Sequence, residues 1–318
     1  MRAFPGRTWR LLPASERGAH RVARAAVDGN ILYAKACLDP QGDVSAELAA
    51  IRAAGSTLAP AIVNAARPTP NRRWFVMQAA PGRPSGAWSA AELGAVAKTL
   101  ARLHRVSVPN ATPALAGGGT LASTLRSGHV AIDKLRGTRV LDAKDARVVS
   151  AALTRAGRPV RELVDLEPQI ALCHGDVRSP NVFFAGPGAR PTATLLDFEH
   201  AGRGDPAIDL ARACAYERLS SHRWFVLCDA YAEAVGDDAT VDRAISLAPA
   251  MALILALQAA RFAVEVLGGR IASAAAAAVA RRLPEIGRRV ETVVGELDGA
   301  RVRVRLQTRR PSGARGHA

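Results

Sequence analysis

Three oxygen-bearing side chains lie near one another in the middle of the chain, in a pattern that suits phosphate chemistry. Asp176 and Asn181 are five positions apart within residues 173–184, and Asp197 follows the mainly hydrophobic residues 194–196. Hard Mg²⁺ prefers oxygen ligands, which Asn181 and Asp197 can offer. The carboxylate of Asp176 is then left to orient an attacking hydroxyl and accept its proton. These residue types supply what an in-line phosphoryl transfer needs.

The same stretch contains three motifs in a fixed order. Residues 174–181 read His-x-Asp-x4-Asn, residues 197–199 read Asp-Phe-Glu, and residues 204–211 read Gly-Asp-Pro-Ala-Ile-Asp-Leu-Ala. A lone His-x-Asp triplet is a weak signal, but three ordered motifs within about forty residues are a strong one. Their order resembles the aminoglycoside phosphotransferase and choline kinase family, whose fold is protein-kinase-like.

The resemblance implies a role for each matching residue. Asp176 matches the catalytic base, and Asn181 and Asp197 match the metal ligands. Arg178 takes the place where protein kinases usually have a lysine near the transferred phosphoryl group. The family resemblance also implies that ATP and Mg²⁺ are used.

Other matching residues are expected to support this loop. His174 matches the structural histidine that packs the loop. Asp205 and Asp209 match positions that brace the loop and open the following helix, where a carboxylate suits the helix N-terminus. Leu103 and His104 resemble the family's Leu-His pair at the end of a helix.

The first part of the chain resembles the nucleotide-binding part of the same family. Lys35 stands where kinase-like folds place the lysine that holds the α- and β-phosphates, and Glu47 is its expected ion-pair partner. The turn that covers the nucleotide is expected at residues 13–20. Gly18 is the one glycine in this turn. Ser15 or the Gly18 amide is therefore expected to do part of the phosphate binding.

Residues 77–80, including Gln78 and Ala80, are expected to meet the adenine edge. The hydrophobic patterns around them predict short strands and helices. Strands are expected at residues 8–12, 21–27, 31–38, 61–65, 74–78, 170–174, 182–184 and 194–198. Helices are expected at residues 44–54, 90–106, 119–136, 143–163, 205–218, 222–235, 239–267 and 271–297.

These elements indicate an α+β, bilobal, protein-kinase-like fold. A small lobe with an antiparallel sheet is expected at residues 1–79, where it binds the nucleotide. A larger, mainly helical lobe at residues 80–300 would carry the catalytic residues and bind the acceptor. The boundary is placed at the Pro-Gly-Arg-Pro cluster of residues 81–84. Residues 301–318 form a basic tail that is expected to be disordered.

The formal net charge of +15 raises the question of nucleic-acid binding. Six arginines lie in the last eighteen residues, which contain no acid, leaving +9 of the +15 for the rest of the chain. A solvated basic surface is the favoured interpretation. The expected partners are ATP and a small hydroxyl acceptor, with no nucleic acid and no membrane.

The four cysteines are far apart and form no Cys-x-x-Cys pair, so neither a zinc site nor a disulfide framework is indicated. Residues 1–13 lack the continuous apolar stretch of a signal peptide, and a cytoplasmic location is expected. The longest apolar stretch, residues 244–260, contains Ser246, Pro249 and Gln258, which favours a buried helix over a membrane span.

The hypothesis from these patterns is an ATP- and Mg²⁺-dependent phosphotransferase that acts on a hydroxyl of an antibiotic or related metabolite. Two alternatives stay open: a metabolite kinase acting on choline, thiamine or a sugar, and a nucleotide-binding pseudokinase, which the glycine-poor turn favours. A cationic acceptor would need acidic side chains, for which the candidates are Glu199, Glu217, Asp229 and Glu265.

Overall fold

The computed structural model describes residues 8–12, 20–37, 44–65, 74–108, 112–115, 118–161, 163, 170–266, 277–288 and 292. The chain divides into two compact units. The first consists of residues 1–127 and 160–248, and the second of residues 128–159 and 249–318. The boundary expected near residue 80 lies inside the first unit and stays a prediction.

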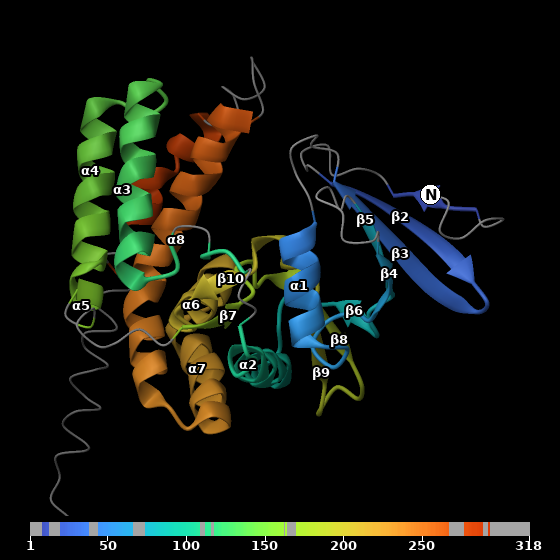
Figure 1. Ribbon diagram of the computed structural model, residues 1–318. Coiled ribbons are helices and arrows are strands. Elements are labelled where there is room, and N and C mark those ends of the chain that lie inside the picture. Colours follow the sequence, from blue (N-terminus) through green and yellow to red (C-terminus); the bar gives the residue numbers. More distant parts are fainter. Residues whose placement is uncertain are drawn as a thin grey trace, which may run out of the picture. The chain divides into compact units, whose positions relative to one another are not determined.

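The first unit begins with a five-stranded antiparallel sheet (Figure 1). Its strands lie in the order β1 (Arg10–Leu11), β2 (His20–Val27), β3 (Asn30–Cys37), β5 (Trp74–Gln78) and β4 (Ile62–Ala65). β2 and β3 form a hairpin in which Val27 pairs with Asn30. The two turn residues, Asp28 and Gly29, have φ of 49° and 79°. Positive φ at both central positions is what a tight two-residue hairpin requires.

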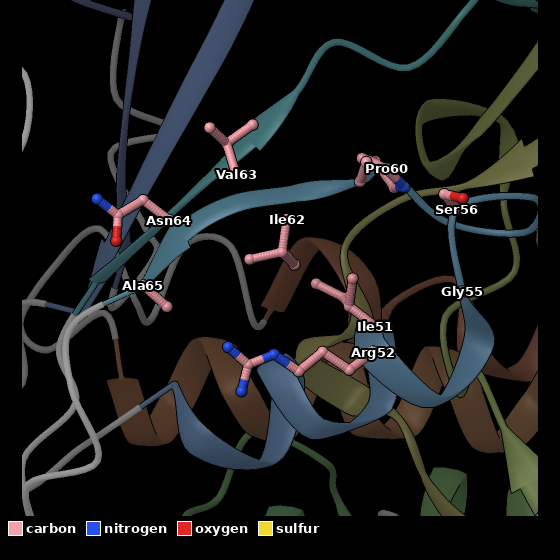
Figure 2. Close-up of a pocket in the computed structure, with 10 residues that line it drawn as sticks. Ile51, Arg52, Gly55, Ser56, Pro60, Ile62, Val63, Asn64 and Ala65 are labelled. Atoms are coloured by element: carbon pink, nitrogen blue, oxygen red, sulfur yellow. The ribbon is translucent and has the colours of Figure 1, made fainter.

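Helix α1 (Ser45–Ala54) follows β3 and ends at Gly55, where φ is 73°. A hollow of about 530 Å³ lies beside it, lined by residues of α1, β4 and their connection. Figure 2 shows Ile51 of α1 and Ile62 of β4 facing each other across this hollow. None of the residues that line it is a predicted site residue.

The rest of the first unit combines helices with two small antiparallel sheets. Helix α2 (Ala90–His104) begins with a capping box formed by Ser89 and Glu92, and it packs against α7 (Ser221–Val235). One sheet pairs β7 (Ala171–Cys173) with β10 (Gly202–Gly204), and the other has the order β6 (Arg83–Pro84), β8 (Val182–Ala185), β9 (Thr192–Leu195). β6 and β10 were not predicted; they contain mainly Gly, Arg and Pro, which carry no strand-like hydrophobic pattern.

The second unit is helical. It contains most of α3 (Leu121–Gly137), all of α4 (Ala143–Ala156) and the later part of α8 (Asp238–Val266), with further helical turns in residues 277–288. A Cβ atom at Gly128 would lie 2.7 Å from Leu153 and 3.0 Å from Ile254, so this glycine lets α3 approach α4 and α8 closely. The helix predicted at 143–163 is wrong at its C-terminal end, because α4 stops before Gly157 and a separate turn, α5 (Arg158–Arg161), follows.

Helix α8 is long and apolar enough to cross a membrane by length and composition. Just over half of its apolar window, 56%, is buried inside the protein, and core helices of soluble proteins pass the same test. Its Arg243 is itself buried, with Nε 2.9 Å from Oδ2 of Asp205. The helix is therefore described as part of the protein core, as the sequence predicted.

Gly82 offers a test of the packing around β6. Its φ is 83°, and a Cβ atom there would lie 1.9 Å from the carbonyl oxygen of Phe184. Gly82→Ala is expected to lower the free energy of unfolding by about 2 kcal/mol or more, because it strains the backbone and overlaps that oxygen. Denaturant unfolding measures this change.

Gly86→Ala is the matched control. Gly86 lies in the same connection, and its added Cβ would meet no atom within 4 Å. We expect this variant to stay within about 0.5 kcal/mol of the wild type. Equal losses in the two variants would contradict the close approach of Gly82 to β8.

Candidate active site

The β8–β9 hairpin brings Asn181 and Asp197 together. Val182 at the start of β8 pairs with Leu195 at the end of β9, so the residues just outside the hairpin also lie side by side. The amide of Leu196 donates to the carbonyl oxygen of Asn181 at 2.8 Å, which continues this pairing by one step. The two predicted metal ligands, sixteen positions apart in sequence, are thus brought near each other by antiparallel register.

Asp176 is held by the residues that follow it in the predicted catalytic loop, residues 174–181, which is called the catalytic loop below. Nδ2 of Asn181 donates to Oδ2 of Asp176 at 2.7 Å and to its carbonyl oxygen at 3.0 Å. Nε of Arg178 donates to the same carboxylate oxygen at 2.8 Å. Because Nδ2 is engaged, the amide oxygen Oδ1 of Asn181 is the group left to bind a cation.

Lys35 is buried and contacts three carboxylates. Its Nζ lies 2.9 Å from Glu47, 2.5 Å from Asp197 and 3.1 Å from Glu199. Burial alone would lower the pKa of Lys35, but the three negative charges outweigh it and raise the pKa above its ordinary value. Lys35 is therefore protonated at neutral pH, and it joins the sheet to Asp197.

Asp197 has a left-handed backbone, with φ of 64° and ψ of 66°. This conformation is uncommon for a residue with a side chain, and such residues cluster at functional sites. It ends the extended chain after β9 and begins the short helix η2 (Phe198–His200). The turn places the Asp197 carboxylate within hydrogen-bond distance of Nζ of Lys35.

His174 connects the catalytic loop to the segment that carries Asp197. Its Nε2 bonds to the carbonyl oxygen of Leu196 at 2.8 Å, and its Nδ1 accepts the amide of Asp176 at 3.3 Å. The ring also packs edge-on against Phe198. Since a carbonyl oxygen only accepts, the proton is assigned to Nε2. Burial lowers the pKa of His174, which agrees with a neutral ring.

Asp209 anchors the start of the catalytic loop from helix α6 (Ala207–Tyr216). Its carboxylate accepts the amides of His174 at 2.6 Å and Gly175 at 2.8 Å, and it bonds to Nε2 of His104 at 3.2 Å. Burial alone would raise the pKa of Asp209, but these hydrogen bonds and the nearby histidines lower it overall. Gly175 has φ of 81°, and a Cβ there would lie 2.3 Å from the carbonyl oxygen of His200.

His104, Cys173 and Asp209 lie close enough to be considered as a metal site, with ligand atoms within 4.8 Å of one another. Their polar atoms already have partners, however. Nδ1 of His104 bonds to the Tyr231 hydroxyl at 2.8 Å, and the Cys173 thiol is bonded by the backbone of Gly204. We therefore interpret this group as a buried hydrogen-bond network.

Asp205 supports the same helix from its N-terminal end. Its Oδ1 accepts the amide of Ala207 at 2.9 Å, and its Oδ2 lies 2.9 Å from Nε of Arg243. Asp205 and Asp209 thus contact backbone amides or buried side chains behind the loop. Their role in bracing the loop stays a prediction.

Residues 31–244 match the phosphotransferase enzyme family, APH. The chain belongs to this family. It is therefore a small-molecule phosphotransferase whose acceptor group is a hydroxyl. A search of curated proteins found no match to the chain.

Three solved structures show the likeness of this phosphotransferase to known folds. A choline kinase from Cryptosporidium parvum Iowa II has a TM-score of 0.64 at 8% identity, covering 92% of this chain and 91% of that one. A macrolide 2′-phosphotransferase from Brachybacterium faecium has 0.58 at 18%, covering 86% and 91%. A spectinomycin phosphotransferase in complex with ADP and spectinomycin has 0.57 at 12%, covering 89% and 93%. The likeness confirms the predicted kinase-like α+β fold.

The other residues predicted to contact the nucleotide form no described bond with Lys35 or with the three carboxylates around it. Gln78 is the exposed last residue of β5. Ala80 lies two positions later and is half-buried. Both lie on the strand next to β3 or just after it, and their contact with adenine stays a prediction. Ser15 and Gly18 lie outside the described residues.

Two contacts of the site were not predicted. Glu217 accepts both the amide and the hydroxyl of Ser179, at 2.7 and 2.5 Å. Tyr216 lies under the guanidinium of Arg178, 6.0 Å from Cζ to the ring centroid. Ser179 is at a variable position of the 174–181 motif, and Glu217 lies 38 positions later, outside the three motifs, so no pattern predicted this contact.

Proposed function

We propose that this phosphotransferase moves the γ-phosphoryl group of ATP, with Mg²⁺, onto a hydroxyl of a small molecule. The observation that carries the proposal is two bonded pairs, Lys35 with Asp197 and Asn181 with Asp176, that the β8–β9 pairing joins through the backbone. Lys35 bonds to Asp197, the amide of Leu196 next to Asp197 donates to the carbonyl oxygen of Asn181, and Asn181 bonds to Asp176. The ADP bound to the similar spectinomycin phosphotransferase supports a nucleotide as phosphoryl donor.

The donor set fits a magnesium ion. Asn181 and Asp197 would hold it with an amide oxygen and a carboxylate, the oxygen ligands that Mg²⁺ prefers. When bound, the ion neutralises charge on the phosphates during transfer. Lys35 would bind the α- and β-phosphates, exchanging its bond to Asp197 for bonds to phosphate oxygens, while Glu47 keeps it in place.

Asp176 would take the proton of the acceptor hydroxyl. Its Oδ2 is already oriented by Arg178 and Asn181, which keeps the carboxylate fixed. Arg178 is partly exposed, with 44% of its side-chain surface accessible, and its charge lies beside the base. It would stabilise negative charge on the transferred group. His174, Asp205 and Asp209 would hold the loop that carries these residues.

Within this reaction class, the charges of the site favour the metabolite-kinase alternative over a polycationic antibiotic. Of the three acids in the first unit that were proposed to face a cationic acceptor, Glu199 is engaged by Lys35 and Glu217 by Ser179. Glu265, in the second unit, is engaged by Arg261. Asp229 is exposed on α7. A polycation would have to displace these contacts, whereas a neutral or singly charged alcohol would not.

An acceptor screen tests the proposed function. We expect Mg²⁺-dependent consumption of ATP with one class of hydroxyl compound, and a product whose mass is increased by one phosphate. The panel should include aminoglycosides, macrolides, choline, thiamine, sugars and neutral alcohols. Turnover confined to aminoglycosides would contradict the charge argument. No turnover with any acceptor would favour the pseudokinase alternative. The cytoplasmic location stays a proposal.

A further inference from the structure

Helix α6 and its C-cap residue bind the catalytic loop at two places. Near the start of the helix, Asp209 accepts the amides of His174 and Gly175, and Arg212 donates to the carbonyl oxygen of Gly175. Beyond the end of the helix, Glu217 binds Ser179. The helix and its C-cap residue therefore bind the loop at His174 and Gly175, and again at Ser179, two positions before Asn181.

Glu217 lies at an unfavourable place for a carboxylate. Helix α6 ends at Tyr216, and Glu217 is its C-cap residue. The helix dipole gives this end a partial negative charge, so an acid costs about 0.3 to 1 kcal/mol here. Two charge-assisted hydrogen bonds to Ser179 offset that cost. The presence of a carboxylate at this position is thus best explained by the two hydrogen bonds that it accepts from Ser179.

The short helix η1 (Ser179–Asn181) needs an outside acceptor. The first amides of a helical turn have no partner within the turn. Pro180 has no N–H, and the amide of Asn181 donates to the carbonyl oxygen of Arg178 at 2.8 Å. The amide of Ser179 is the donor that remains, and Glu217 accepts it at 2.7 Å. Glu217 therefore completes the hydrogen bonding of this turn.

We infer that Glu217 is a positioning residue for the amide group of Asn181, and through it for the metal–nucleotide complex. The inference rests on the proposed function. Only Pro180 separates Ser179 from Asn181, and its ring fixes the backbone between them. A shift of Ser179 is therefore passed to Asn181, whose side chain orients Asp176 and leaves Oδ1 for the metal.

The test compares Glu217→Ala with the full-length wild type. Mn²⁺ binding is measured by electron paramagnetic resonance in the presence of a non-hydrolysable ATP analogue, together with kcat and KM. Residues that orient a metal ligand typically change metal affinity or activity by 10- to 100-fold, so we expect Mn²⁺ affinity and kcat each to fall about 10-fold. The acceptor KM and the thermal unfolding midpoint should change little.

A second variant and a control separate positioning from a general loss of structure. Ser179→Ala keeps the amide bond to Glu217 and should lose less than Glu217→Ala. The double variant should lose less than the sum of the two free-energy changes, because the residues act as a pair. Glu233→Ala removes an exposed glutamate of α7 and should behave as wild type.

Two results would overturn the inference. If Glu217→Ala binds Mn²⁺ as well as wild type and only the acceptor KM rises, Glu217 contacts the acceptor and does not position Asn181. If the wild type itself binds no Mn²⁺ with the nucleotide analogue, the proposed function fails as well. The metal titration therefore distinguishes the failure of this inference from the failure of the function on which it rests.

Discussion

Replacing Asp176 with Asn is expected to lower kcat by about 10²- to 10⁴-fold, the range that a positioned general base contributes. An amide of the same shape cannot accept the proton of the acceptor hydroxyl. In the wild type, one carboxylate oxygen, Oδ2, accepts from both Arg178 and Asn181. An asparagine oxygen can keep these two bonds, so the loop should stay in place.

The measurement combines turnover with nucleotide binding. Calorimetric titration of the Asp176→Asn variant with an ATP analogue and Mg²⁺ should give an affinity within a few-fold of wild type. Asp133→Asn, at an exposed position of α3, removes the same charge elsewhere and should leave kcat unchanged. Near-normal transfer by the Asp176 variant to every acceptor would show that the base has been assigned wrongly.

Local signals in the sequence predicted most elements that position the site. The strand at 74–78 has the predicted bounds. The Asp28-Gly29 pair is a sequence typical of a tight turn, and both residues have the positive φ that such a turn requires. Helix α2 begins at a Ser-x-x-Glu capping box. In each case the residues that decide the conformation are within a few positions of one another, which is why the pattern is visible in the sequence.

Contacts between distant residues were predictable only where the family resemblance marked both partners. The resemblance predicted the pair of Lys35 and Glu47, and the structure places them 2.9 Å apart. Glu199 was a candidate to contact a cationic acceptor, but its carboxylate lies 3.1 Å from Nζ of Lys35. Neither Glu217 nor Ser179 has an unusual local pattern. Their pairing depends on where α6 ends relative to the catalytic loop, which is a property of tertiary packing.

Lys35→Met is expected to lower both activity and stability. The loss of a charge that stabilises the phosphates should reduce kcat by about 10²- to 10³-fold, as for other preorganised electrostatic groups. Glu47 is buried, with 6% of its surface exposed, and Lys35 supplies its ion pair. Breaking a buried pair by removing one partner costs about 3 to 5 kcal/mol, because the remaining charge has no compensation. Lys98→Met, at an exposed site of α2, is the control.

The pH dependence of this loss follows from the sign of the pKa shift. Burial raises the pKa of Glu47, and Lys35 is the group that opposes this rise. Without Lys35 the folded protein holds a proton on Glu47 more tightly than the unfolded chain does. The variant is therefore most destabilised at neutral pH, and the difference from wild type should shrink as the pH falls towards the ordinary range of a glutamate.

The double variant Lys35→Met with Glu47→Leu separates the two effects of Lys35. Replacing both partners of a buried ion pair with apolar residues is often neutral or stabilising, so the unfolding midpoint should return towards wild type. Activity should stay as low as in Lys35→Met, because no cation is left to meet the phosphates. Asp197 and Glu199 are about one-third exposed, so their charges are screened by solvent and should cost little without Lys35. Recovery of turnover along with stability would mean that Lys35 serves only to neutralise Glu47, and that the nucleotide is held elsewhere.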